Sequence, residues 1–233
     1  MRKLDESLLT HLAPFSALTK GEIREILDQA TSHRYVAGEA VFEQSAPADR
    51  FFLLLDGYIR VVRMTPDGDH VTMMHIPAGQ LFGIAKALGH THYPASAVCA
   101  SETIALAWPM RLWSEFEQRY TGFSTANQQM VGRRLNELHD RVVEMATQQV
   151  EQRIANALVR LIKQTGRKTD SGIEVDFPIT RQDLSEITGT TLHTVSRLLS
   201  AWEKRGIVES RRKRIVVSQP DQLIVMAETT AQR

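Results

Sequence analysis

The spacing of hydrophobic positions changes twice along the chain. Residues 6–30 carry apolar side chains at helical spacing, interrupted by Pro14, and this pattern predicts short helices. From Tyr35 to Trp108 the apolar runs are short and are separated by Gly, Pro and Asp every 8–12 residues. Many short strands joined by tight turns are typical of a sandwich, barrel or roll. After Pro109 the spacing becomes helical again.

Three strands are predicted at Phe51–Leu55, Tyr58–Met64 and His70–His75. The last two are separated by a stretch that contains Asp67-Gly68. Glycine tolerates the positive φ that a tight hairpin turn demands, so this dipeptide predicts a β-hairpin.

The helix beyond Pro109 carries a narrow apolar seam with alternating steps of four and three residues. Its members are Val131, Leu135, Leu138, Val142 and Met145. A narrow stripe flanked by charged side chains is typical of a two-stranded coiled coil, which predicts a homodimer with these residues at its interface. A surface helix that packs on its own domain is the alternative.

A further helix is predicted near Glu151–Gln164, with Gly166 as its C-cap. The polar stretch Arg167–Gly172 that follows is predicted to be a loop.

Residues 178–217 carry the pattern that points most directly to a function. Thr180 with Asp183 three residues later resembles a capping box at the start of a helix, and Gly189 ends that helix. A second helix, Leu192–Lys204, follows after a short turn. Two helices joined in this way form a helix-turn-helix, whose second helix enters the major groove of DNA.

The alternating segment after Gly206 predicts a β-hairpin wing with a basic tip at Arg211–Arg214. Between Thr180 and Ile215 there are eight basic and four acidic residues, a local excess of about four positive charges. The whole chain has a net charge of only +1, so this excess is local and suits a surface that docks on phosphates.

The predicted contacts to double-stranded DNA fall into two groups. Arg197 is predicted to read a guanine, because arginine bidentate to guanine is the commonest specific base contact. The expected base-reading residues are His193, Ser196 and Arg197. The expected backbone contacts are Thr180, Arg181, Thr191, Thr194, Arg211, Arg212 and Lys213.

Composition narrows the remaining classes of protein. The chain is 42% hydrophobic and 24% charged, as in ordinary globular proteins, and no run of about 18 apolar residues occurs. We therefore expect a cytoplasmic protein with no membrane partner. A single cysteine, Cys99, rules out an intrachain disulfide and an iron–sulfur cluster held by one chain. No phosphate loop, nucleophile elbow or zinc-protease motif occurs, so we do not expect an enzyme.

The motifs together resemble the CRP/FNR family of bacterial regulators along nearly the whole chain. The matching segments are Gly38-Glu39, Asp56–Val61, Pro77–Gly83, Thr180–Leu184, Gly189, Thr194–Leu199 and Arg205–Val208. The resemblance implies an α+β fold with an N-terminal jelly-roll-like β-roll of the cyclic-nucleotide-binding type, a long dimerisation helix and a C-terminal winged helix-turn-helix. The expected domains are residues 1–110, 111–148 and 149–233.

Differences from known branches of the family indicate the signal. Where cyclic-AMP receptors carry Gly-Glu and Arg-Ser pairs, this chain reads Gly83-Ile84 and Pro94-Ala95, so no cAMP binding is expected. The run from Gly189 to Arg197, with Ser200–Glu203, is similar to the nitric-oxide-responsive branch called NnrR, which controls nitrite and nitric oxide reductase genes.

That resemblance implies haem b as the nitric oxide receiver, with His11 as the first candidate ligand and no certain metal site. His33, His75, His90 and His92 are further candidates. Cys99 is expected to be a small buried apolar residue, with an axial thiolate or a redox thiol as the alternatives. The resemblance also implies a palindromic TTG-type operator and RNA polymerase as a partner. A regulator with another effector, or one that binds DNA without any effector, is the alternative.

Overall fold

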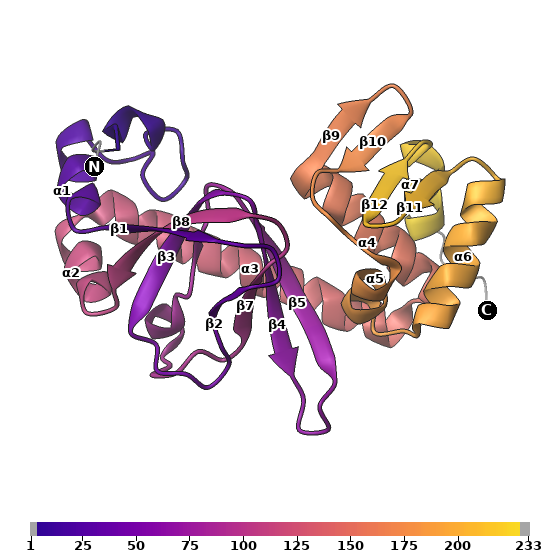
Figure 1. The fold of residues 1–233 in the computed structure, drawn as a ribbon, viewed down its shortest axis with the longest axis horizontal. Helices are drawn as coiled ribbons and strands as arrows, with labels where there is room; N and C mark the ends of the chain where they lie inside the picture. The colour runs from indigo at the N-terminus through magenta and orange to yellow at the C-terminus, as the bar shows by residue number, and fades with distance from the viewer. Residues whose placement is uncertain (1–3, 229–233) are drawn as a thin grey trace. The chain divides into compact units, whose positions relative to one another are not determined.

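The computed structural model describes residues 4–228 and contains two compact units. The first unit comprises the chain up to Met64 together with His75–Glu137. The second comprises Thr65–Met74 together with the chain from Leu138 onward. Figure 1 shows the order of the elements along the chain. The expected α+β class with a β-rich N-terminal part, a long helix and a C-terminal helix-turn-helix is confirmed.

The β-roll consists of two antiparallel four-stranded sheets. One has the order β1-β8-β3-β6 and the other β2-β7-β4-β5. The strands are β1 (Thr31–Tyr35), β2 (Ala40–Phe42), β3 (Arg50–Asp56), β4 (Tyr58–Met64), β5 (His70–Pro77), β6 (Leu81–Phe82), β7 (Ser96–Cys99) and β8 (Thr103–Pro109). The predicted turn between β4 and β5 is present, with Gly68 at a φ of 89°. The three predicted strands are thus confirmed to within one or two residues.

Short helices cover the core of the first unit. They are η1 (Glu6–Leu8), α1 (Lys20–Leu27), η2 (Ala85–Leu88) and α2 (Leu112–Arg119). The core is rich in aromatic side chains, and Trp108 stacks on Phe51 with ring centroids 5.4 Å apart. The Trp108 indole donates a hydrogen bond of 2.8 Å to the carbonyl oxygen of Ile26. This bond satisfies a buried donor and fixes α1 to the sheet.

The long helix α3 runs without interruption over Thr121–Thr147. Of its predicted seam, Val131 and Leu138 are half-buried, whereas Leu135, Val142 and Met145 are 52%, 66% and 45% exposed. An apolar stripe left exposed on one long helix is what a partner helix would cover. The division between the two units falls within α3, between Glu137 and Leu138, so the domain boundaries at residues 110 and 148 stay predictions.

Within the second unit, Arg141 on α3 holds the β4–β5 turn region. The Arg141 guanidinium donates hydrogen bonds to the carbonyl oxygens of Thr72, Met73 and Ile187. The hydroxyl of the buried Thr72 donates to the carboxylate of Glu186 at 3.0 Å. Burial lowers the pKa of Arg141.

The second unit continues with α4 (Val150–Thr165) and a sheet of order β11-β12-β10-β9. Its other elements are β9 (Gly166–Thr169), β10 (Gly172–Val175), α5 (Arg181–Thr188), α6 (Leu192–Lys204), β11 (Val208–Arg211), β12 (Arg214–Val217) and α7 (Pro220–Glu228). Among residues 4–228, no helix is long and apolar enough to cross a membrane.

One expectation for the segment after α4 was wrong. The stretch Arg167–Gly172 is a β-hairpin of β9 and β10, not a loop. Gly166 is the C-cap of α4, as predicted, and its backbone is extended, with φ −75° and ψ 133°. A Cβ at Gly166 would lie 2.2 Å from the carbonyl oxygen of Ile162, so close packing explains the glycine.

Candidate nucleic-acid interface

The first helix of the motif, α5, begins at a complete capping box. The Thr180 hydroxyl accepts a hydrogen bond from the Asp183 backbone amide at 3.1 Å, and the Asp183 carboxylate accepts from the Thr180 amide at 2.7 Å. Gly189 ends α5 in the left-handed conformation, with φ 60° and ψ 42°. Thr191 then caps α6 by accepting from the Thr194 amide at 3.2 Å. These local signals set the turn between the two helices.

One face of α6 is fixed in the core of the second unit. Val195 and Leu199 are fully buried, and Leu198 is half-buried. The buried Trp202 donates a hydrogen bond of 3.1 Å from its indole to the carboxylate of Glu151 on α4. The packing holds α6 in place and decides which side chains face solvent.

The opposite face of α6 carries the predicted base-reading residues. His193 and Arg197 are exposed, and Ser196 is half-buried. Within residues 4–228, neither the His193 ring nor the Arg197 guanidinium has a hydrogen bond or an ion pair. Both side chains are therefore available to a ligand, as base readout from a recognition helix requires.

The wing forms as predicted from β11 and β12, with Arg212 and Lys213 in the turn. Lys213 has a φ of 59°, a conformation that glycine adopts at lower cost, so a cationic side chain occupies a position that favours glycine. The Lys213 carbonyl accepts a hydrogen bond of 3.2 Å from the Ile179 amide, which joins the wing to the segment before α5.

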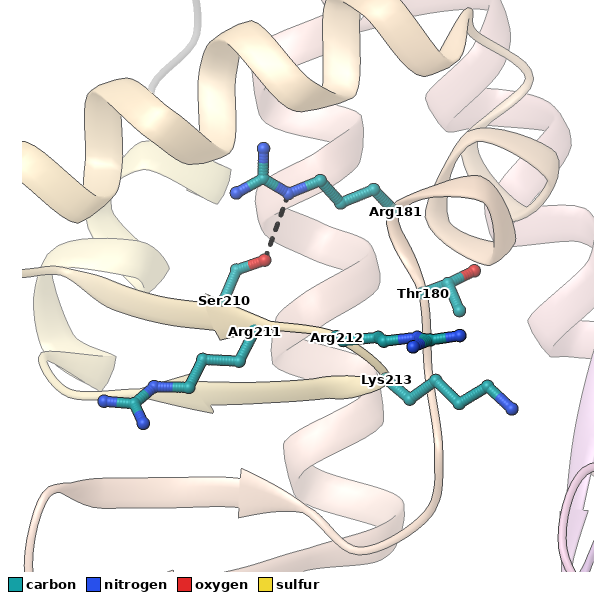
Figure 2. Close-up of a pocket in the computed structure, with 6 residues that line it drawn as sticks. All are labelled: Thr180, Arg181, Ser210, Arg211, Arg212 and Lys213. Atoms are coloured by element: carbon teal, nitrogen blue, oxygen red, sulfur yellow. Dashed lines mark hydrogen bonds between the residues drawn. The ribbon is translucent and has the colours of Figure 1, made fainter.

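A surface cleft of about 300 Å³ lies between the wing and the start of α5. It is lined by Thr180, Arg181, Ser210, Arg211, Arg212 and Lys213. Figure 2 shows Arg212 and Lys213 extending on the side of Thr180, while Arg211 extends away from Thr180. A cleft with cationic walls suits a phosphate group.

Arg181 differs from the other cleft residues because its guanidinium is already paired. It lies 3.1 Å from the carboxylate of Glu203 and donates to the Ser210 hydroxyl at 3.1 Å. The Thr180 hydroxyl is likewise occupied, since it donates to the Asp183 carboxylate at 2.7 Å. Among the predicted backbone contacts, the wing side chains Arg211, Arg212 and Lys213 have no hydrogen bond or ion pair within the described chain.

Arg214, at the start of β12, is held by an ion pair. Its guanidinium lies 2.7 Å from the carboxylate of Glu174 on β10, which also pairs with Arg167 at 3.2 Å. The hydrogen bond from Arg214 lowers the pKa of Glu174 below its ordinary value. The cluster stiffens the sheet behind the wing.

Burial increases the positive character of this surface beyond the sequence count. Between Thr180 and Ile215, Arg181 alone among the eight basic residues is not exposed, whereas Glu209 alone among the four acidic residues is exposed. Sequence reasoning did not single out Glu203, Ser210 or Glu174. The i, i+7 spacing of Ser196 and Glu203 on α6 was visible, but their partners lie on other elements.

The residues considered for effector binding are scattered over the first unit. His11, His90 and His92 are exposed, and His33 and His75 are half-buried. Ile84 and Ala95, at the positions that distinguish this chain from cyclic-AMP receptors, are buried. Cys99 is also buried, and burial raises the pKa of its thiol, so it packs as a small apolar residue.

Comparison with known proteins agrees with this architecture. Residues 152–226 match the Crp-like helix-turn-helix domain, and residues 32–120 match the cyclic nucleotide-binding domain. The chain is 19% identical over 218 residues to the CRP-like cAMP-activated global transcriptional regulator of Mycobacterium tuberculosis, covering 94% of this chain and 97% of that protein. It is 23% identical to the fumarate and nitrate reduction regulatory protein of Salmonella typhimurium, covering 83% and 77%.

Solved structures show the same fold. FixK2 from Bradyrhizobium japonicum superposes with a TM-score of 0.76 at 20% identity, covering 87% of this chain and 99% of that one. A CooA mutant from Carboxydothermus hydrogenoformans superposes with a TM-score of 0.73 at 22% identity, covering 88% and 90%.

The winged helix-turn-helix, with His193 and Arg197 exposed on its second helix, defines a DNA-binding protein. Because family models match both the N-terminal and the C-terminal domain, the chain belongs to the CRP/FNR family of transcription regulators. These relatives are regulators and not enzymes, as expected from the sequence. Regulators of this family bind DNA as dimers.

Proposed function

We propose that this chain binds a palindromic operator as a homodimer and reads a TTG half-site, separated by eight base pairs from CAA, through Arg197. The observation that carries the proposal is the free guanidinium of Arg197 on the exposed face of α6, in a domain where Arg181 and Arg214 are paired internally. A free planar guanidinium is suited to bidentate contact with guanine.

Base-by-base binding measurements test this proposal. Arg197→Ala should weaken binding to the TTG duplex by about 1–3 kcal/mol and remove most of the preference for guanine. Arg214→Ala is the matched control and should leave the preference unchanged, because Arg214 is paired with Glu174. Equal weakening on all duplexes by Arg197→Ala would make Arg197 a phosphate contact and contradict the proposal.

The exposed part of the α3 seam supports the homodimer. Val142 and Leu135 are more than half exposed, and a second copy of the helix is the simplest surface that covers them. Two recognition helices related by a two-fold axis require half-sites about one helical turn apart, which the eight-base gap provides. RNA polymerase is the partner through which the bound dimer acts, and in vitro transcription from an operator-bearing promoter tests that step.

Nitric oxide is the signal we propose, and nitrite and nitric oxide reductase genes are the proposed targets. The support is the likeness of the segment from Gly189 to Arg197 to the nitric-oxide-responsive branch, together with a single cysteine that excludes a cluster held by one chain. Cyclic AMP is not proposed as a ligand, because buried Ile84 and Ala95 offer no charge to a phosphate.

Haem b is the group proposed to receive nitric oxide, with His11 as a ligand. The His11 imidazole is exposed and is a chemically suitable axial ligand, and Leu8 nearby is 55% exposed. Leu9 and Phe15 are already packed in the core, so a haem ligated by His11 would rest on the surface of the N-terminal segment.

Absorption spectra of the purified protein, with and without haem and nitric oxide, test the sensing proposal. A Soret band that shifts with nitric oxide and is lost in His11→Ala supports it, with His70→Ala as the control, since His70 is exposed and is not a candidate ligand. Operator binding that is unchanged by nitric oxide would instead favour another effector or constitutive binding.

A further inference from the structure

The Arg181 side chain donates five hydrogen bonds within its own domain. Its Nε donates to the Ser210 hydroxyl at 3.1 Å, and its Nη1 donates to the Ser196 carbonyl at 3.4 Å and the Ser200 hydroxyl at 3.3 Å. Its Nη2 donates to both carboxylate oxygens of Glu203, at 3.1 and 3.2 Å. Every nitrogen of the guanidinium therefore has an acceptor within the domain.

Glu203 extends this network to the wing. The same carboxylate accepts a hydrogen bond of 2.9 Å from the backbone amide of Ser210 on β11. The side chains of Arg181 and Glu203 are only 30% and 29% exposed, so water competes less for the ion pair than on an open surface. One arginine and one glutamate thus join the first residue of α5, the last turns of α6 and the first strand of the wing.

The contacts of Arg181 on α6 follow a single stripe. Ser196, Ser200 and Glu203 are spaced by four and three residues, so they lie on one side of the helix. The guanidinium bridges two turns of α6 and ends at the carbonyl of Ser196, the residue directly before Arg197.

Directional contacts matter here because the rest of the α5–α6 contact is apolar. Leu184, Val195 and Leu199 are fully buried, but apolar packing is non-directional and tolerates small shifts of one helix along the other. A forked set of charge-assisted hydrogen bonds has fixed geometry, and it determines both the register and the rotation of α6.

We infer that Arg181 and Glu203 form a positioning pair that sets base specificity by orienting α6 and the wing, and that Arg181 is not a phosphate contact. The inference rests on the proposed reading of DNA by α6. A phosphate contact and a positioning residue are two different roles for Arg181, and they predict opposite results. A phosphate contact adds affinity for every duplex, whereas a positioning residue affects the choice between duplexes.

Glu203→Gln gives the sharpest test, because elementary electrostatics and the positioning role predict different signs. Removing a negative charge from a DNA-binding domain should strengthen binding to any duplex. Loss of a positioning contact should instead reduce the ratio of specific to non-specific affinity. We expect that ratio to fall by about tenfold, which lies within the range that one misplaced bidentate base contact costs.

The experiment uses the full-length protein and duplexes selected from a random library by the unaltered chain. Binding of the selected duplex and of a scrambled duplex is measured at several salt concentrations for Arg181→Gln, Arg181→Lys, Glu203→Gln and Glu174→Gln. Glu174→Gln is the matched control, since it removes the same charge from an Arg–Glu pair that does not touch α6. Thermal unfolding followed by circular dichroism shows whether each variant is folded. If Glu203→Gln does not fold, Ser210→Ala is the milder substitution that replaces it in the test.

Two results support the inference. Glu203→Gln loses base preference while Glu174→Gln keeps it. Arg181→Gln loses base preference with an unchanged salt dependence, and Arg181→Lys retains part of that preference. A uniform gain of affinity in Glu203→Gln with base preference intact would overturn it. A weaker salt dependence in an Arg181→Gln variant, by about one released ion per protomer, would overturn it as well. If the unaltered chain selects no sequence from the library, the proposed function is contradicted. This result is obtained before any variant is compared, so it is distinct from failure of the positioning role.

Discussion

The wing is expected to supply much of the electrostatic affinity for DNA, and the structure gives the size of the effect. Arg211, Arg212 and Lys213 are exposed, and none of their side chains has a hydrogen bond or an ion pair within residues 4–228. If each contacts one phosphate in each protomer of a dimer, replacing all three by alanine removes six contacts. The slope of log K against log salt should then fall by about 5, at about 0.9 per phosphate. Titration of a fluorescent duplex from 50 to 300 mM KCl measures this slope.

Arg214→Ala is the control for the wing variant, because Arg214 is adjacent in sequence but its guanidinium is held by Glu174. It should change the slope by less than about 1. Base preference should stay nearly constant in the triple variant, since phosphate contacts carry no sequence information directly. A slope change below about 2 in the triple variant, or an equal change in Arg214→Ala, would refute the assignment of the wing to phosphates.

Three further predictions concern the dimer, the cap and the sheet behind the wing. Lysines at both Leu135 and Val142 should give a monomer in sedimentation experiments, because burying each apolar side chain is worth about 1.5–3 kcal/mol, whereas Leu88→Lys, outside the seam, should stay dimeric. Thr180→Ala should lower the free energy of unfolding by about 1 kcal/mol in urea titrations through loss of the α5 cap, and an unchanged value would show that the capping box adds nothing. The pKa of Glu174 is lower in the folded chain than its ordinary value of 4.5, so its ion pairs stabilise the fold above that pH and are lost as the pH falls through the folded pKa. Glu174→Gln should therefore be less stable than the unaltered chain at neutral pH and equal to it in acid, and a stability difference independent of pH would contradict this.

The helix-turn-helix could be predicted because its signals are local. Thr180 with Asp183, the positive φ of Gly189 and the cap at Thr191 each act within a few residues, and the structure has all three. The β4–β5 hairpin was predicted for the same reason, since Gly68 permits its turn. The exposed apolar seam of α3 followed from periodicity alone.

The segment after α4 could not be predicted in this way. Arg167 and Lys168 are exposed, so β9 has no apolar alternation, and it is a strand only because its backbone pairs with β10. Gly166 is needed because the Ile162 carbonyl lies close to it, a contact set by how the chain turns from α4 into the sheet.

The sequence by itself therefore determined the order of the elements, the caps of the recognition motif and the family to which the chain belongs, because these depend on residues near one another in the chain. Only the tertiary structure decided which cations are free for DNA. Arg181 and Arg214 meet Glu203 and Glu174, which lie 22 and 40 residues away in sequence, while Arg197 and the wing tip meet no acidic partner in the described chain. The sequence shows which residues are charged. Whether a charged side chain is available to a ligand depends on which distant side chain the fold places beside it.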